Sequence, residues 1–99
     1  MGKRKVNILD TAAAAVAEVA FFIESKGMPD TAKKFVDDTF IFFEKLADTK
    51  MIYRPCQYQR WIALGYRCAT FRKKYTVAYL NMENEIVVCD FVLAKLLAE

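Results

Sequence analysis

The sequence predicts an α+β fold, in which an N-terminal strand and an antiparallel helical hairpin pack on a C-terminal antiparallel β-meander. Two long segments with helical spacing of apolar residues follow a short alternating segment, and three β-rich runs with short connections come after them. Hydrophobic residues make up 56% of the 99 residues, which is enough to bury a core without disulfides or metals. We therefore expect residues 1–99 to form one domain.

The chain begins with a predicted strand at residues 3–9, where apolar and polar residues alternate. Asp10 and Thr11 offer side-chain oxygens that can cap a helix, which we expect over residues 11–26. Its alanines favour helix, and Gly27 provides a stop. The inward stripe of this helix consists of apolar residues at three- and four-residue spacings: Ala12, Val16, Val19, Ala20 and Ile23.

A second helix is predicted over residues 29–48, after a connection so short that the two helices must form an antiparallel hairpin. Pro29 suits its first turn, where a backbone N–H has no helical partner. Its inward stripe is Ala32, Phe35, Val36, Thr39, Phe43, Leu46 and Ala47. The apolar runs at residues 21–22 and 40–43 are too wide for one stripe. They form either a second buried contact or an exposed surface that docks a partner or a second copy.

The C-terminal half is predicted to be a long connection followed by three strands. Residues 49–65 lack a sustained period and have room for a short helix at residues 57–64. The tail that begins at Val92 either extends the last strand or forms one or two helical turns. The meander is predicted by three β-rich runs, at residues 66–71, 75–80 and 85–91.

Positive charge is concentrated in residues 49–82, which contain no Asp or Glu. The net charge of the whole chain is only +3, so its distribution and not its total makes a polyanionic target plausible. A stand-alone nucleic-acid binder with this charge would bind weakly and with a steep dependence on salt. The basic residues of the stretch are Lys50, Arg54, Arg60, Arg67, Arg72, Lys73 and Lys74.

The cysteines do not predict a metal site. Cys56, Cys68 and Cys89 are widely spaced and the chain has no histidine, so we expect no metal and no cofactor. We interpret all three as ordinary thiols of a reducing compartment. No apolar run approaches the roughly 20 residues of a membrane span, so we expect a cytoplasmic protein with no membrane partner.

The helical segments contain VAFFI and PDTAKKFVDDTF, and the C-terminal segment reads GYRCATFRKKYTVAYLNMENEIVVCDFV. Together these motifs resemble the RelE/ParE superfamily of bacterial toxins, over nearly the whole chain. The most specific matches are Gly65-Tyr66-Arg67, Lys74-Tyr75 and Tyr79. The resemblance implies a RelE/ParE-like fold and the toxin of a type II toxin–antitoxin (plasmid stabilisation) system, neutralised by a cognate antitoxin in a hetero-oligomer, or existing as a homodimer.

The resemblance also implies candidate target-binding residues, namely Arg60, Arg67, Arg72, Lys73, Lys74, Tyr75 and Lys95. RelE-like members cleave messenger RNA on the ribosome, whereas ParE-like members poison DNA gyrase. Many members carry a histidine and arginines after the last strand, where this chain has Leu93, Lys95 and Leu97. The nuclease set is therefore incomplete, and we favour ParE-like inhibition by binding.

Two alternatives remain for the function: a RelE-like ribosome-dependent endoribonuclease, and a non-toxic binding module that kept the fold. Structural alternatives remain for single residues as well. Arg67 has Glu85 or Asp90 as possible cross-strand partners. Tyr75 and Tyr79 share a strand face and can belong to the core instead of a site.

Overall fold

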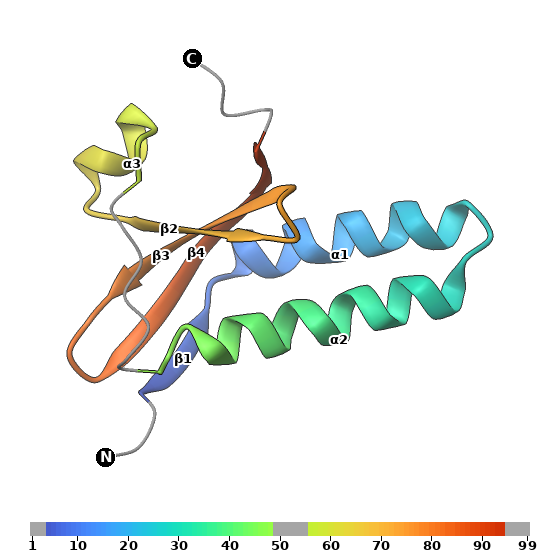
Figure 1. Cartoon of the computed structure of the whole chain (residues 1–99), viewed down its shortest axis with the longest axis horizontal. Coiled ribbons are helices and arrows are strands. Elements are labelled where there is room, and N and C mark those ends of the chain that lie inside the picture. Colours follow the sequence, from blue (N-terminus) through green and yellow to red (C-terminus); the bar gives the residue numbers. More distant parts are fainter. Residues whose placement is uncertain (1–3, 49–55, 95–99) are drawn as a thin grey trace.

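The computed structural model describes residues 4–48 and 56–94, and the order of its elements is the predicted one. In chain order these are β1 (Lys5–Ile8), α1 (Asp10–Ser25), α2 (Pro29–Lys45), α3 (Gln59–Ala63), β2 (Arg67–Phe71), β3 (Tyr75–Asn81) and β4 (Glu85–Leu93). Figure 1 shows α1 and α2 side by side as a long antiparallel hairpin. In the same view, α3 lies near the start of β2. The predicted strand, helical hairpin, short helix and three strands are all confirmed.

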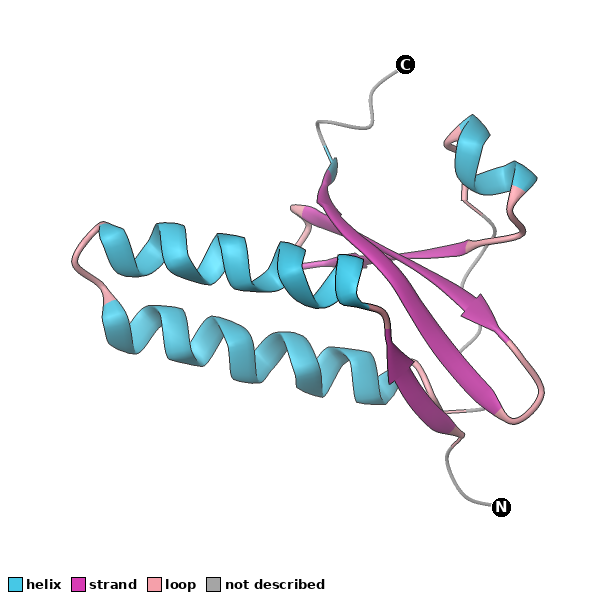
Figure 2. Ribbon diagram, turned by 180° about the vertical axis from the view of Figure 1, so that it is seen from behind, coloured by secondary structure: helices cyan, strands magenta, loops and turns pink. Residues whose placement is uncertain are grey.

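The sheet has the strand order β1-β4-β3-β2 (Figure 2). β2, β3 and β4 form the predicted antiparallel meander, and β4 continues to Leu93, so the start of the tail extends the last strand. β1 pairs in parallel with β4, with Val6 opposite Ile86. A bulge interrupts the β3–β4 ladder, because Ala78 pairs with Asp90 while Tyr79 pairs with Val88.

The helices differ from prediction at their ends. Leu9, not Asp10 or Thr11, is the N-cap of α1, and it makes no side-chain cap. The predicted cap is wrong because the helix begins one residue earlier, which puts the Asp10 carboxylate in the first turn, where it favours the helix dipole instead. α2 ends at Lys45, three residues short of prediction, although the N–H of Ala47 still donates to the oxygen of Glu44.

The main core lies between the helical hairpin and one face of the sheet, and aromatic rings dominate it. Tyr75 stacks on Phe91 with centroids 4.9 Å apart, and Phe35 meets Tyr75 edge-on at 5.6 Å. Thr39 is also fully buried, and its hydroxyl donates to the Phe35 carbonyl at 2.7 Å. The predicted stripes of both helices face this core.

Only part of the extra apolar surface on the helices is buried. Phe40 and Phe42 pack against the core, as one alternative predicted. Phe21, Phe22 and Ile41 are instead 72%, 60% and 54% exposed. The hairpin thus keeps an apolar outer surface.

On the opposite face of the sheet, α3 forms a small second cluster. Trp61 packs there with Cys56 and Ala78. Cys56 and Cys68 form a disulfide, so the expectation of three free thiols is wrong for this pair. The N–H of Cys56 donates to the carbonyl of Tyr66, which brings Cys56 beside the start of β2. Cys89 is a buried free thiol, as expected.

Candidate functional site

The predicted site residues fall into two groups at opposite ends of β2. Arg60 lies on α3 and Arg67 begins β2, whereas Arg72 and Lys73 lie in the turn after Phe71. Five residues of extended strand span roughly 17 Å. The structure therefore does not gather these cations at one point.

Lys95 lies outside the described residues, and Arg67 is half-buried. By strand alternation, Arg67 shares the helix-facing side of the sheet with Ala69 and Phe71. Its cross-strand neighbour is the buried Tyr79.

The β2–β3 turn holds two non-glycine residues in the left-handed region, Arg72 at φ 57° and Lys73 at φ 58°. The N–H of Lys74 donates to the Phe71 carbonyl at 3.1 Å, as in a type I′ turn. Asn and Gly normally occupy the central positions of such turns, because other residues pay a steric cost there. The carbonyl of Lys74 accepts from Ala94 at 2.8 Å, which fixes the turn to the end of β4.

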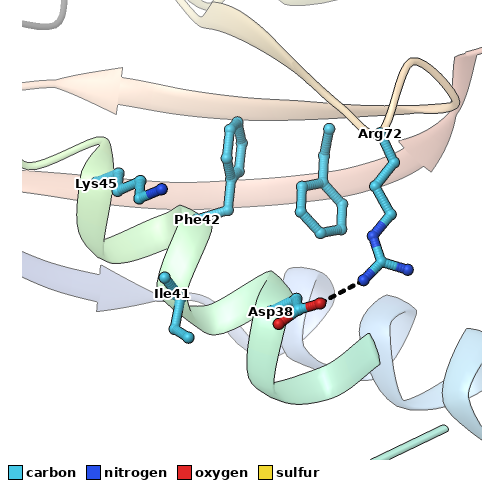
Figure 3. Close-up of a pocket in the computed structure, with 6 residues that line it drawn as sticks. Asp38, Ile41, Phe42, Lys45 and Arg72 are labelled. Carbon is cyan, nitrogen blue, oxygen red and sulfur yellow. Dashed lines mark hydrogen bonds and ion pairs between the residues drawn. The ribbon is translucent and has the colours of Figure 1, made fainter. Parts of the chain in front are cut away.

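Arg72 anchors this turn to α2 (Figure 3). Its guanidinium lies 2.5 Å from the Asp38 carboxylate, and the same carboxylate lies 3.3 Å from Lys34. The guanidinium also covers the rings of Phe71 and Phe35, at 5.2 and 5.6 Å from their centroids. Lys34 and then Arg72 hold the pKa of Asp38 below its usual value. The structure thus gives Arg72 an intramolecular role that the sequence did not predict.

Lys73 and Lys74 follow Arg72 in the turn and, like it, are exposed. Within the described ranges neither forms an ion pair, and the Lys74 ammonium lies 5.9 Å from the ring of Tyr75. They remain candidates for contact with an acidic partner.

Tyr75 is a core residue. It is only 8% exposed and stacks on Phe91, so the alternative that placed it in the core is confirmed. Its ring meets Phe35 of α2 at 5.6 Å, so contact of Tyr75 with a target stays a prediction for which the ring offers little free surface. Tyr79 is buried on the same face.

A groove between α2 and the β2–β3 turn was not predicted (Figure 3). Its volume is about 240 Å³, and it is lined by Asp38, Ile41, Phe42, Lys45, Phe71 and Arg72. The rings of Phe42 and Phe71 lie 5.1 Å apart and form its apolar part. Ile41 and Lys45 follow one another at helical spacing, but no local pattern pairs this stretch with a turn about 30 residues later. We call this set of six residues the α2–turn groove.

No group of metal-ligating side chains occurs among residues 4–48 and 56–94. In the same ranges, no helix is long and apolar enough to cross a bilayer.

Comparisons with known proteins give a structural match only. No family model matches the chain, and no curated protein matches it. A chain of the chromosomal ParDE TA system from P. aeruginosa superposes with a TM-score of 0.75 at 17% identity. The match covers 92% of this chain and 96% of that one. The two chains share one fold. The predicted α+β fold of strand, helical hairpin and meander is thereby confirmed as one that the ParDE chain shares.

Proposed function

We propose that this chain is the toxin of a type II toxin–antitoxin system and inhibits its target by binding. The observation that carries the proposal is the fold shared with the ParDE chain over nearly its whole length. The sequence motifs Gly65-Tyr66-Arg67 and Lys74-Tyr75 point to the same superfamily independently of that superposition. The ParE-like target would be DNA gyrase in the cytoplasm of a bacterium.

Binding without chemistry is supported by the placement of the candidate residues. General acid–base cleavage of RNA needs proton-transferring groups within hydrogen-bond reach of one phosphate. The chain has no histidine, Tyr75 is buried, and Arg72 is engaged by Asp38. We propose instead that the exposed Lys73 and Lys74 contact an acidic surface of the target.

The surface also offers a place for an antitoxin. The α2–turn groove combines apolar rings with the cations of Lys45 and Arg72, and its one carboxylate, Asp38, is already paired twice. We propose that an antitoxin segment with apolar and acidic side chains occupies this groove. The toxin would then be silent in a hetero-oligomer.

Expression in a bacterial host, with and without the adjacent open reading frame, tests the proposal. We expect growth to stop when the chain is expressed alone and to recover with its neighbour. Accumulated gyrase-cleaved DNA would support ParE-like binding. Translation-dependent cuts in messenger RNA would favour the RelE-like ribonuclease, and unaffected growth in both cases would favour a non-toxic binding module.

A further inference from the structure

The segment that carries α3 lies outside the hydrogen-bonded ladders of the sheet. The described backbone hydrogen bonds of residues 57–65 are local; for example, Ile62 donates to Tyr58 and Gly65 donates to Ile62. None of these bonds joins the segment to a described strand. The covalent tie is the disulfide between Cys56 and Cys68, the second residue of β2.

A small aromatic cluster also attaches α3 to the sheet. Trp61 is 7% exposed and lies between Tyr58 at 5.4 Å and Tyr66 at 6.2 Å. Beneath it is Ala78 on the face of the sheet that the helical hairpin does not cover. Because the main core lies on the other face, loss of this cluster would leave the packing of α1 and α2 on the sheet intact.

We propose that the Cys56–Cys68 disulfide is a reversible redox site, and that its reduction by a dithiol releases α3 from the sheet. Cys68 is partly exposed, whereas Cys56 is only 4% exposed, so in this proposal the reductant thiolate attacks the Cys68 sulfur. Its attack breaks the S–S bond, forms a mixed disulfide on Cys68 and expels Cys56 as a thiolate. The second thiol of the reductant then displaces Cys68. Two electrons and two protons pass from the dithiol, which becomes a disulfide, to the two cysteines.

The third cysteine does not disturb this exchange. Cys89 is buried in β4 at the bulge, where its thiol contacts the hydroxyl of Tyr66. Burial raises the pKa of Cys89, so it stays a thiol and is a poor nucleophile toward the disulfide. The site is thus restricted to two states, with Cys56 and Cys68 either joined or both reduced.

The two states differ in what they present to a partner. α3 carries the cation of Arg60, and Ile62 and Leu64 are 49% and 57% exposed beside it. The disulfide holds these three side chains in one arrangement, and reduction abolishes that arrangement. Redox control of target binding rests on the proposed function, because Arg60 is a target contact only there, whereas the release of α3 does not rest on it.

Thiol counting and hydrogen exchange on the purified full chain test the inference. Protein equilibrated with oxidised dithiothreitol should show one alkylatable thiol after denaturation, and protein equilibrated with reduced dithiothreitol should show three. Reduction should speed amide exchange in residues 57–65 by roughly tenfold or more while exchange in α1, α2 and β3 stays unchanged. Both readouts are independent of toxicity, so failure of the toxin assay leaves them interpretable.

Matched variants complete the test. The double variant Cys56→Ser, Cys68→Ser should show the fast exchange of residues 57–65 with or without reductant, and Cys89→Ala should respond to reductant as the parent does. Three alkylatable thiols after oxidation would overturn the inference. So would unchanged exchange in residues 57–65 on reduction, or global loss of protection, which would make the disulfide a general staple of the fold.

Discussion

The Asp38 carboxylate lies 2.5 Å from the Arg72 guanidinium, although 34 residues separate the two in the chain. The pair joins the middle of α2 to a turn whose central residues have positive φ. Backbone strain of this kind persists where surrounding contacts hold it in place. Arg72 supplies such contacts, to Asp38 and to two aromatic rings of the core.

The substitution Arg72→Ala should therefore destabilise the fold. It removes the ion pair and the stacking on Phe71 and Phe35. We expect the thermal midpoint to fall by about 2–5 °C, mainly through the lost ring contacts, since an exposed ion pair contributes little. Differential scanning calorimetry measures the change.

Lys34→Ala is the matched control for Arg72→Ala. Lys34 also pairs with Asp38, but its side chain is 75% exposed and it is one helical turn away on the same helix. Its loss should change the midpoint by less than the loss of Arg72. An equal or larger effect for Lys34→Ala would contradict the anchoring role of Arg72.

Asp38 should also make stability depend on pH in the acid range. Lys34 and Arg72 lower the folded-state pKa of Asp38 below 3.8, its ordinary value. A depressed pKa means that the carboxylate stabilises the fold above about the ordinary value, and that this contribution is lost as pH falls through the folded-state pKa. The difference in unfolding free energy between the parent and Asp38→Asn should thus be constant near neutral pH and vanish in acid. Urea titrations at several pH values measure it, and a difference that grows on acidification would refute the assignment.

Replacing Lys73 with glycine should stabilise the fold. Glycine adopts positive φ without the steric cost that Lys73 pays at φ 58°. We expect a gain of about 1 kcal/mol in unfolding free energy from urea denaturation. Lys74→Gly is the control, because Lys74 is not among the positive-φ residues and glycine there should lower stability. If both variants were destabilised equally, the strained turn would not exist in solution.

The sequence predicted the elements well because their signals are local. The alternation at residues 3–9, the helical stripes and the β-rich runs each specify an element from neighbouring residues. Pro29 marked the start of α2 correctly for the same reason. Stripes at helical spacing also located the residues that the two helices contribute to the core.

Contacts between distant segments could not be predicted in this way. The parallel pairing of β1 with β4, the Cys56–Cys68 disulfide and the Asp38–Arg72 pair each depend on how the whole chain folds back. Nothing in residues 49–82 showed that β2 would divide their cations into two groups. The candidate site was therefore predicted as a list of residues and not as an arrangement.

Tyr75→Phe distinguishes a core role of this tyrosine from a chemical one. The substitution keeps the ring that stacks on Phe91 and removes only the hydroxyl. We expect stability to change by less than about 1 kcal/mol and toxicity to be retained. Tyr75→Ala should instead cost about 3–5 kcal/mol, because it empties part of the core. Loss of toxicity in a stably folded Tyr75→Phe protein would show that the hydroxyl takes part in chemistry.

The α2–turn groove gives the sharpest test of the antitoxin contact. Ile41→Asp and Lys45→Glu put negative charge at the exposed wall and at the cationic end of the groove, where an acidic segment would meet it. Each should weaken binding of the protein encoded by the adjacent gene by roughly tenfold or more, measured by isothermal titration calorimetry. Both side chains are exposed, so unfolding free energy should change by no more than about 0.5 kcal/mol.

Lys33→Glu is the control. Lys33 is an exposed lysine of α2 outside the groove, and its substitution changes the charge by the same amount as Lys45→Glu. Equal losses of affinity for Lys33→Glu and Lys45→Glu would mean that net charge, and not this groove, governs the interaction.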